Sequence, residues 1–272
     1  MYEITEDQIK ASWWAYFANI SYLDDKTGEV LAVLETTGQE ATILFVSDHG
    51  YMLGERELWF KMSFYEGSAR VPLMVASPDF APGAVTTPVP TTDVCPTLCD
   101  LAGVSIAEVM PWTSRESLLQ LAAGGTRSKL VAMEYAAEAS YAPMVSLCSD
   151  RWKYTRYVLD PEQLFDLEAD PNELRNLASN PQYVEALSDL RVLSQALWNL
   201  DLFVADIRES QARRWEVYEA LRKGGYYPWD YQPLQKASER YKRNYMDLNN
   251  LEAQKRVQQS DKPLFLNVYN FK

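Results

Sequence analysis

One continuous apolar run constrains the fold of this chain more than any other feature. Residues 41–47 include four large apolar side chains in succession, with no alternation of polar and apolar positions. Such a run is typical of a strand buried on both faces, as in a parallel sheet covered by helices. A long helical stretch precedes it, because Thr5 and Gln8 have capping-box spacing and Gly38 is a plausible stop after Glu35. The sequence therefore predicts an α/β fold.

The pattern changes near Met144. Before this residue we expect two further strands and a helix, whereas the short apolar runs after it are separated by turn residues. Their hairpin spacing predicts a small antiparallel sheet, which a long helical region follows. The expected strands are 72–76, 129–135, 144–149, 152–158 and 163–166, and the expected helices are 91–101 and 172–222, with an amphipathic run from Pro181. We accordingly divide the chain into 1–143, 144–222 and a tail, 223–272.

Composition argues against several classes of protein. The 272 residues carry a net charge of -12, which argues against general nucleic-acid binding. No apolar run approaches the ~20 residues of a membrane-spanning helix, and the acidic N-terminus has neither the basic start nor the apolar stretch of a secretory signal. Three cysteines are too few for a disulfide framework. A reduced, cytoplasmic setting therefore fits best.

The negative charge is unevenly distributed. Residues 211–272 hold 12 Lys and Arg against 7 Asp and Glu, whereas the rest of the chain is strongly acidic. The same segment is rich in Tyr and Trp, in which disordered segments are poor. We therefore expect this basic, aromatic tail to lie on a protein surface.

An acidic residue and the single histidine of the chain follow the apolar run directly. In open α/β sheets, ligands sit at the carboxyl ends of strands, which is where Asp48 and His49 stand. A carboxylate suits a hard divalent cation, and His49 adds a nitrogen ligand or contacts the substrate. The alternative is that Asp48 caps a turn and His49 is merely packed.

The surrounding residues carry a resemblance to a known family. Residues 50–55 and 58–73 resemble the sulfatase branch of the alkaline phosphatase superfamily, and residues 164–177 are similar to a hairpin-and-helix motif near sulfatase C-termini. The resemblance implies that Asp48 and His49 bind a divalent metal (Ca²⁺, Mg²⁺ or Mn²⁺). It also implies a catalytic role for His49 and for Lys61, thirteen residues after Asp48, which holds the sulfate group. A compact ammonium suits this role, because it binds non-bridging oxygens as charge develops.

A narrower resemblance is to the choline sulfatases. It rests on residues 55–63 and on the tail segments 227–234 and 237–249. It implies hydrolysis of choline O-sulfate and assembly into a homo-oligomer, a tetramer, through the tail. Two alternatives stay open: another sulfatase or phosphonate hydrolase of the superfamily, and a non-catalytic module that retains only the tail's role in oligomerisation.

The chain departs from the family pattern at the nucleophile. Sulfatases convert a Cys or Ser in a C/S-x-P-x-R motif to formylglycine, and this sequence has no such motif. Residues 95–99 do not match it, because the proline is one position early and no arginine follows. The resemblance therefore implies the C-terminal portion of a choline sulfatase, with the formylglycine and further metal ligands in a missing N-terminal half. Segment 1–143 is then the C-terminal part of the sulfatase α/β domain, and the chain alone is expected to be inactive.

Recognition of choline requires a carboxylate and aromatic faces, because a quaternary ammonium donates no hydrogen bond. Glu138 matches the carboxylate with which the family holds this cation, and Glu134 is its local competitor; either is otherwise a solvated loop acid. The family also places an acidic tail residue of a neighbouring subunit near the choline. Asp247 is the first candidate for that residue and Asp230 the alternative.

Overall fold

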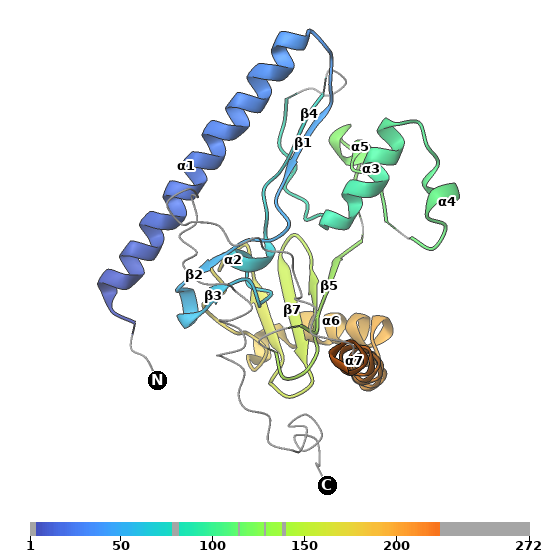
Figure 1. The fold of residues 1–272 in the computed structure, drawn as a ribbon. Helices are drawn as coiled ribbons and strands as arrows, with labels where there is room; N and C mark the ends of the chain where they lie inside the picture. Colours follow the sequence, from blue (N-terminus) through green and yellow to red (C-terminus); the bar gives the residue numbers. More distant parts are fainter. Residues whose placement is uncertain (1–3, 78–81, 114, 128, 138–139, 224–272) are drawn as a thin grey trace. The chain divides into compact units, whose positions relative to one another are not determined.

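The computed structural model describes residues 4–77, 82–113, 115–127, 129–137 and 140–223 (Figure 1). The chain divides into two compact units, Met1–Ile207 and Arg208–Lys272. The helices are α1 Glu6–Thr37, α2 Glu66–Ala69, α3 Val94–Leu101, α4 Ile106–Val109, α5 Leu119–Ala122, α6 Val184–Leu197 and α7 Leu200–Lys223. The strands are β1 Ile43–Val46, β2 Met52–Leu53, β3 Trp59–Phe60, β4 Leu73–Ala76, β5 Val131–Tyr135, β6 Met144–Cys148, β7 Trp152–Tyr157 and β8 Gln163–Asp166. No helix within the described residues is long and apolar enough to cross a membrane.

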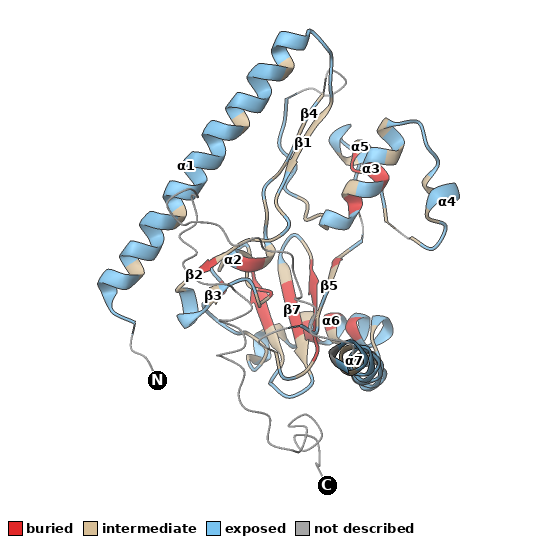
Figure 2. Cartoon of the chain, in the orientation of Figure 1, coloured by how far each residue is buried: buried red, intermediate tan, exposed pale blue. Residues whose placement is uncertain are grey.

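The long helix α1 begins and ends where the sequence predicts. The backbone N–H of Gln8 donates to the Thr5 hydroxyl at 3.3 Å, and the Gln8 side chain accepts from the Thr5 N–H at 2.9 Å, which completes the capping box. Gly38 ends the helix in the left-handed conformation at φ 63°. No residue of α1 is buried, and Figure 2 shows the helix exposed along its length. The side chains of Trp14 and Phe17 are 74% and 60% exposed.

The strand predicted from the apolar run forms, but its surroundings differ from the prediction. β1 pairs with β4 in an antiparallel register that joins Ile43 to Ala76 and Val46 to Leu73, and the described residues add no third strand to this pair. The first three residues of β1 are half-buried, and Val46 is exposed at 38%. The expectation of a parallel strand buried on both faces was therefore wrong for the described residues. A two-stranded ribbon leaves much of its apolar surface uncovered.

The main core lies in a four-stranded antiparallel sheet of order β5-β6-β7-β8. The predicted hairpin strands are confirmed, and β5 joins them at the edge beside β6. Apolar side chains of the sheet pack against two leucines of α6, and Figure 2 shows the buried residues concentrated there. The members of this buried cluster are Leu147, Tyr154, Leu164, Leu187 and Leu190.

The helical region after the sheet begins later than predicted. Residues 172–180 form turns, and the helical part starts with a single 3-10 turn at Pro181–Tyr183 that leads into α6. Glu173 takes φ 54°, and the Asn176 side chain accepts hydrogen bonds from the backbone of Leu164 and Ala178, each at 3.0 Å. The predicted helix over 172–180 was therefore wrong, because side chains there bond to the backbone in place of the helical ladder.

Candidate active site

The turn after β1 holds the first candidate residues. Ser47 donates from its hydroxyl to the carbonyl of His49 at 2.9 Å, and the backbone N–H of His49 donates to Asp48 Oδ1 at 2.9 Å. The Nδ1 atom of His49 lies 2.8 Å from the carbonyl oxygen of Gly50. If this nitrogen carries the proton, Nε2 is free as an acceptor or ligand. The turn thus fixes both side chains through local hydrogen bonds.

Asp48 and His49 form a pair of potential metal ligands. His49 Nε2 lies 3.4 Å from Asp48 Oδ2, and the two side chains are 36% and 83% exposed, respectively. The N–H of His49 holds the pKa of the Asp48 carboxyl below its usual range, with smaller contributions from the charges of His49 and Lys61. An ionised, exposed carboxylate beside an imidazole fits two ligands of a hard divalent cation. Within the described residues, no group of three His, Cys, Asp or Glu side chains is placed so that it could hold a metal ion.

Lys61 reaches the same region from a different segment. It follows β3 directly, where Phe60 takes φ 70°, and its side chain is exposed. Its positive charge makes a small contribution to the lowered pKa of the Asp48 carboxyl. The Ser68 hydroxyl donates to the carbonyl of Lys61 and attaches this loop to α2.

A close backbone approach joins the turn after β1 to α2. The N–H of Gly50 donates to the carbonyl of Ser68 at 2.8 Å, and the N–H of Tyr51 donates to the carbonyl of Gly67 at 2.6 Å. A Cβ atom on Gly50 would lie 2.2 Å from the Gly67 oxygen. Only glycine fits here. The segment 64–69 is therefore a common support for both Asp48-His49 and Lys61.

A buried ion cluster anchors that support to the four-stranded sheet. Lys153 on β7 is 1% exposed, and its Nζ donates to the Phe64 carbonyl at 2.9 Å and to Glu66 Oε1 at 2.5 Å. Glu173 Oε1 lies 2.9 Å from the same Nζ, and Glu173 Oε2 accepts the N–H of Glu66 at 2.7 Å. We name Lys153, Glu66 and Glu173 the lysine cluster. It connects positions that lie 87 and 107 residues apart in the chain.

Sequence reasoning missed the role of Lys153. A lysine between two aromatic residues of a strand reads as exposed, and no local signal distinguishes it. Glu173 was visible only as part of a motif resembling a sulfatase C-terminus. Arg56 adds a second connection that the sequence did not reveal. Its guanidinium lies 4.2 Å from the centre of the Tyr65 ring and donates to the Asn172 carbonyl at 3.1 Å.

Of the candidate choline-binding residues, the structure describes only Glu134. Glu138, Asp247 and Asp230 lie outside the described residues. The competitor Glu134 is described: its carboxylate accepts the indole N–H of Trp198 at 2.7 Å. Glu134 is thus engaged within the protein.

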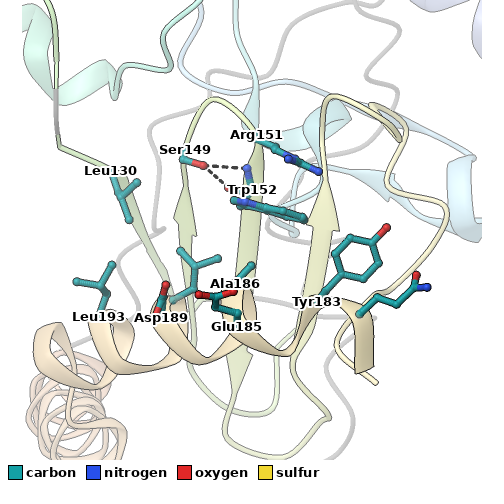
Figure 3. Close-up of a pocket in the computed structure, with 11 residues that line it drawn as sticks. Leu130, Ser149, Arg151, Trp152, Tyr183, Glu185, Ala186, Asp189 and Leu193 are labelled. Atoms are coloured by element: carbon teal, nitrogen blue, oxygen red, sulfur yellow. Dashed lines mark hydrogen bonds between the residues drawn. The ribbon is translucent and has the colours of Figure 1, made fainter. Parts of the chain in front are cut away.

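A cavity between the four-stranded sheet and α6 shares no residue with this site. This cavity of about 570 Å³ opens between β7 and α6 (Figure 3). Trp152 and Tyr183 meet edge to face at 5.8 Å, and the Arg151 guanidinium lies over the Trp152 ring at 4.5 Å. Glu185 and Asp189 line its α6 side.

Comparison with known proteins identifies the family. Residues 54–199 match the family described as N-sulphoglucosamine sulphohydrolase, C-terminal, which covers more than half of the chain. The chain belongs to the sulfatase family. Residues 205–257 also match the family described as choline sulfatase enzyme C terminal, so the sulfatase match continues into the tail.

Individual relatives agree with this membership. The choline-sulfatase of Rhizobium meliloti is 58% identical over 260 residues, which is 94% of this chain and 51% of the relative. Arylsulfatase K of Gallus gallus is 33% identical over 201 residues, 69% of this chain and 38% of the relative. Among solved structures, the phosphonate monoester hydrolase of Agrobacterium radiobacter has a TM-score of 0.60 at 25% identity, covering 71% of this chain and 42% of that structure. The sulfatase chain spans about half the length, or less, of these relatives.

The comparisons confirm the predicted resemblance and the sulfatase-like α/β fold class. The two matched families are both described as C-terminal, so the chain corresponds to the C-terminal portion of a sulfatase. Sulfatases in general use a formylglycine and a divalent metal. Asp48, His49 and Lys61 are the described candidates for part of that machinery.

Proposed function

We propose that this chain is the C-terminal portion of a choline sulfatase and hydrolyses choline O-sulfate to choline and sulfate when an N-terminal half completes it. The observation that carries the proposal is the 58% identity to a choline-sulfatase over 94% of the chain. The match of residues 205–257 to the choline sulfatase C-terminal family supports the same substrate.

Each candidate residue has a chemical role in this proposal. Lys61 binds the non-bridging oxygens of the sulfate group, and its charge stabilises the negative charge that develops on the ester. Asp48 and His49 hold a divalent cation, with His49 alternatively contacting the substrate. When bound, such a cation acts as a Lewis acid toward the sulfate ester. The lysine cluster holds the two loops that carry these residues in fixed positions relative to each other.

The surface of the described residues supports completion by further protein. α1 has no buried residue although it carries several large apolar side chains, and β1 is half-exposed beside β4. Large exposed apolar surfaces are typical of interfaces. The proposal includes a homo-oligomer, a tetramer, formed through the basic tail, whose aromatic residues suit an interface. It also includes a cytoplasmic location, which the three free cysteines support.

The alternative within the superfamily is a phosphonate hydrolase or another sulfatase. Because the structure is similar to a phosphonate monoester hydrolase, the test of function includes a phosphonate substrate. The second alternative, an oligomerisation module without activity, predicts assembly without sulfate release. Substrate preference and activity of a completed protein distinguish all three.

The function is tested by complementation. We expect the chain alone to release no sulfate, because it lacks the formylglycine motif. Co-expressed with the half of the Rhizobium meliloti choline-sulfatase that it does not match, in a host that matures sulfatases, it should hydrolyse choline O-sulfate. Ion chromatography of released sulfate is the measurement, with an aryl sulfate and a phosphonate monoester as competing substrates. Activity of the chain alone, or preference of the pair for either competitor, contradicts the proposal.

Glu138 is expected to control choline selectivity. In the complemented protein, Glu138→Gln should raise KM for choline O-sulfate about 5- to 150-fold, the equivalent of ~1–3 kcal/mol for a lost charge contact. An uncharged aryl sulfate should be nearly unaffected, since it has no ammonium group to lose a partner. Glu134→Gln is the matched control, because Glu134 already binds Trp198. Equal changes for both substrates would assign Glu138 a structural role.

A further inference from the structure

Two cysteines and a methionine lie at α3 and α4, in a part of the chain that shares no residue with the candidate active site. Cys95 lies on α3, and Met110 ends α4, which follows α3 and contacts it (Figure 1). The Cys95 thiol donates to the Met110 thioether, with 3.5 Å between the two sulfur atoms. A thiol and a thioether that are 15 residues apart in sequence are thus in direct contact.

Cys99 brings a second thiol to the same place. Residues four apart are neighbours on one helix face, and Cys99 stands one turn after Cys95 on α3. Burial raises the pKa of the Cys99 thiol, and the neighbouring Cys95 thiol raises it further. Cys95 is exposed and Cys99 is half-buried, so an ion from solvent can reach the pair.

The third cysteine is of a different kind. Cys148 is buried in β6, where its thiol donates to the Ser149 carbonyl, and burial raises its pKa to about 11. It therefore serves as an internal control for thiol chemistry.

We propose that Cys95, Cys99 and Met110 form a binding site for a soft monovalent metal ion, Cu(I). Thiolate and thioether sulfur favour Cu(I), whereas Ca²⁺ and Mg²⁺ require oxygen ligands. Three sulfur atoms about 2.3 Å from a central ion lie about 4 Å apart in a trigonal plane, which is close to the Cys95–Met110 separation. Tetrahedral zinc requires four ligands, and the described residues contain no group of three His, Cys, Asp or Glu side chains that could hold a metal ion.

Binding is a ligand exchange without a redox step. Cu(I) displaces one proton from the Cys95 thiol and one from the Cys99 thiol, and Met110 donates a sulfur lone pair without losing a proton. Two protons are released for each ion, and the metal stays in the +1 state throughout. Because thiols must deprotonate, the apparent affinity should increase with pH.

The test titrates the reduced 272-residue chain with acetonitrile-stabilised Cu(I) under nitrogen, in competition with a colorimetric Cu(I) chelator. We expect one equivalent of tightly bound copper, a thiolate-to-copper absorption band in the ultraviolet and release of two protons. Cys95→Ser, Cys99→Ser and Met110→Leu should each weaken binding by about 100-fold or more, since loss of even an outer-shell partner costs 10- to 100-fold. Cys148→Ser and the exposed Met74→Leu are the matched controls and should bind as the unchanged chain does.

Three results would overturn the site. In the first, the Cys95→Ser/Cys99→Ser double variant still binds one equivalent of Cu(I). In the second, Met110→Leu binds Cu(I) with unchanged affinity. In the third, the unchanged chain binds Zn²⁺ as tightly as Cu(I). Far-UV circular dichroism checks that each variant folds. A measurement on the unchanged chain does not depend on variants: bound Cu(I) should protect Cys95 and Cys99 from alkylation by iodoacetamide. Alkylation of both at the copper-free rate also contradicts the proposal.

Discussion

Replacing Lys153 by methionine is expected to lower the free energy of unfolding by about 3–5 kcal/mol, because the change leaves two buried or half-buried carboxylates without their cation. Lys153 is 1% exposed, and its ammonium lies 2.5 Å from Glu66 and 2.9 Å from Glu173. Urea denaturation followed by circular dichroism measures the loss. The same substitution at Lys10, whose ion pair with Glu6 is exposed, should change stability by about 0.5 kcal/mol or less.

A combined variant separates charge from packing. If unpaired carboxylates cause the loss, adding Glu66→Gln and Glu173→Gln to Lys153→Met should restore part of the stability. Removing all the charges of a buried cluster often changes the free energy of unfolding little. A loss caused by packing alone would not be restored. A Lys153→Met variant as stable as the Lys10→Met control would show that the lysine cluster does not hold the support segment.

In the complemented protein, Lys61→Ala is expected to lower kcat for choline O-sulfate by about 10²- to 10³-fold, the usual effect of removing one donor to a developing negative charge. Lys61→Arg should retain part of the rate, because it keeps the charge but not the compact shape of the ammonium. Steady-state kinetics of sulfate release are the measurement.

The control for Lys61 is Lys129→Ala. Lys129 is half-exposed and pairs with Glu116 at 2.5 Å, in a different part of the chain from the candidate site. Its replacement should leave kcat unchanged. If Lys61→Ala is as active as Lys129→Ala, Lys61 does not bind the sulfate group.

The predictions for Lys153 and Lys61 both depend on the segment 64–69. Ser68 attaches the Lys61 loop to α2, and Gly50 attaches the Asp48-His49 turn to the same segment. Lys153 then fixes the segment to β7. A weakened lysine cluster is therefore expected to disturb Lys61 and Asp48 together, although Lys153 touches neither.

The sequence by itself determined the features whose signals act over a few residues. The Thr5–Gln8 capping box and Gly38 placed α1, because a helix end is decided by the hydrogen bonds of its own terminal turn. The strands 144–148, 152–157 and 163–166 followed from turn residues at hairpin spacing. Asp48 and Lys61 became candidates because they lie in one short stretch that resembles the sulfatases, and their roles stay predictions.

Only the tertiary structure decided which elements meet. The apolar run of β1 predicted a strand but not its antiparallel partner β4, since many partners satisfy the same apolar pattern. Residues 172–180 form turns and not the predicted helix, because the Asn176 side chain accepts hydrogen bonds from the backbone of β8 and of its own turn. The burial of Lys153 depends on Glu173 and Glu66, which approach it from distant parts of the chain. Local patterns carry no information about such contacts, because their free energy arises only when the packed elements exclude water from the paired groups.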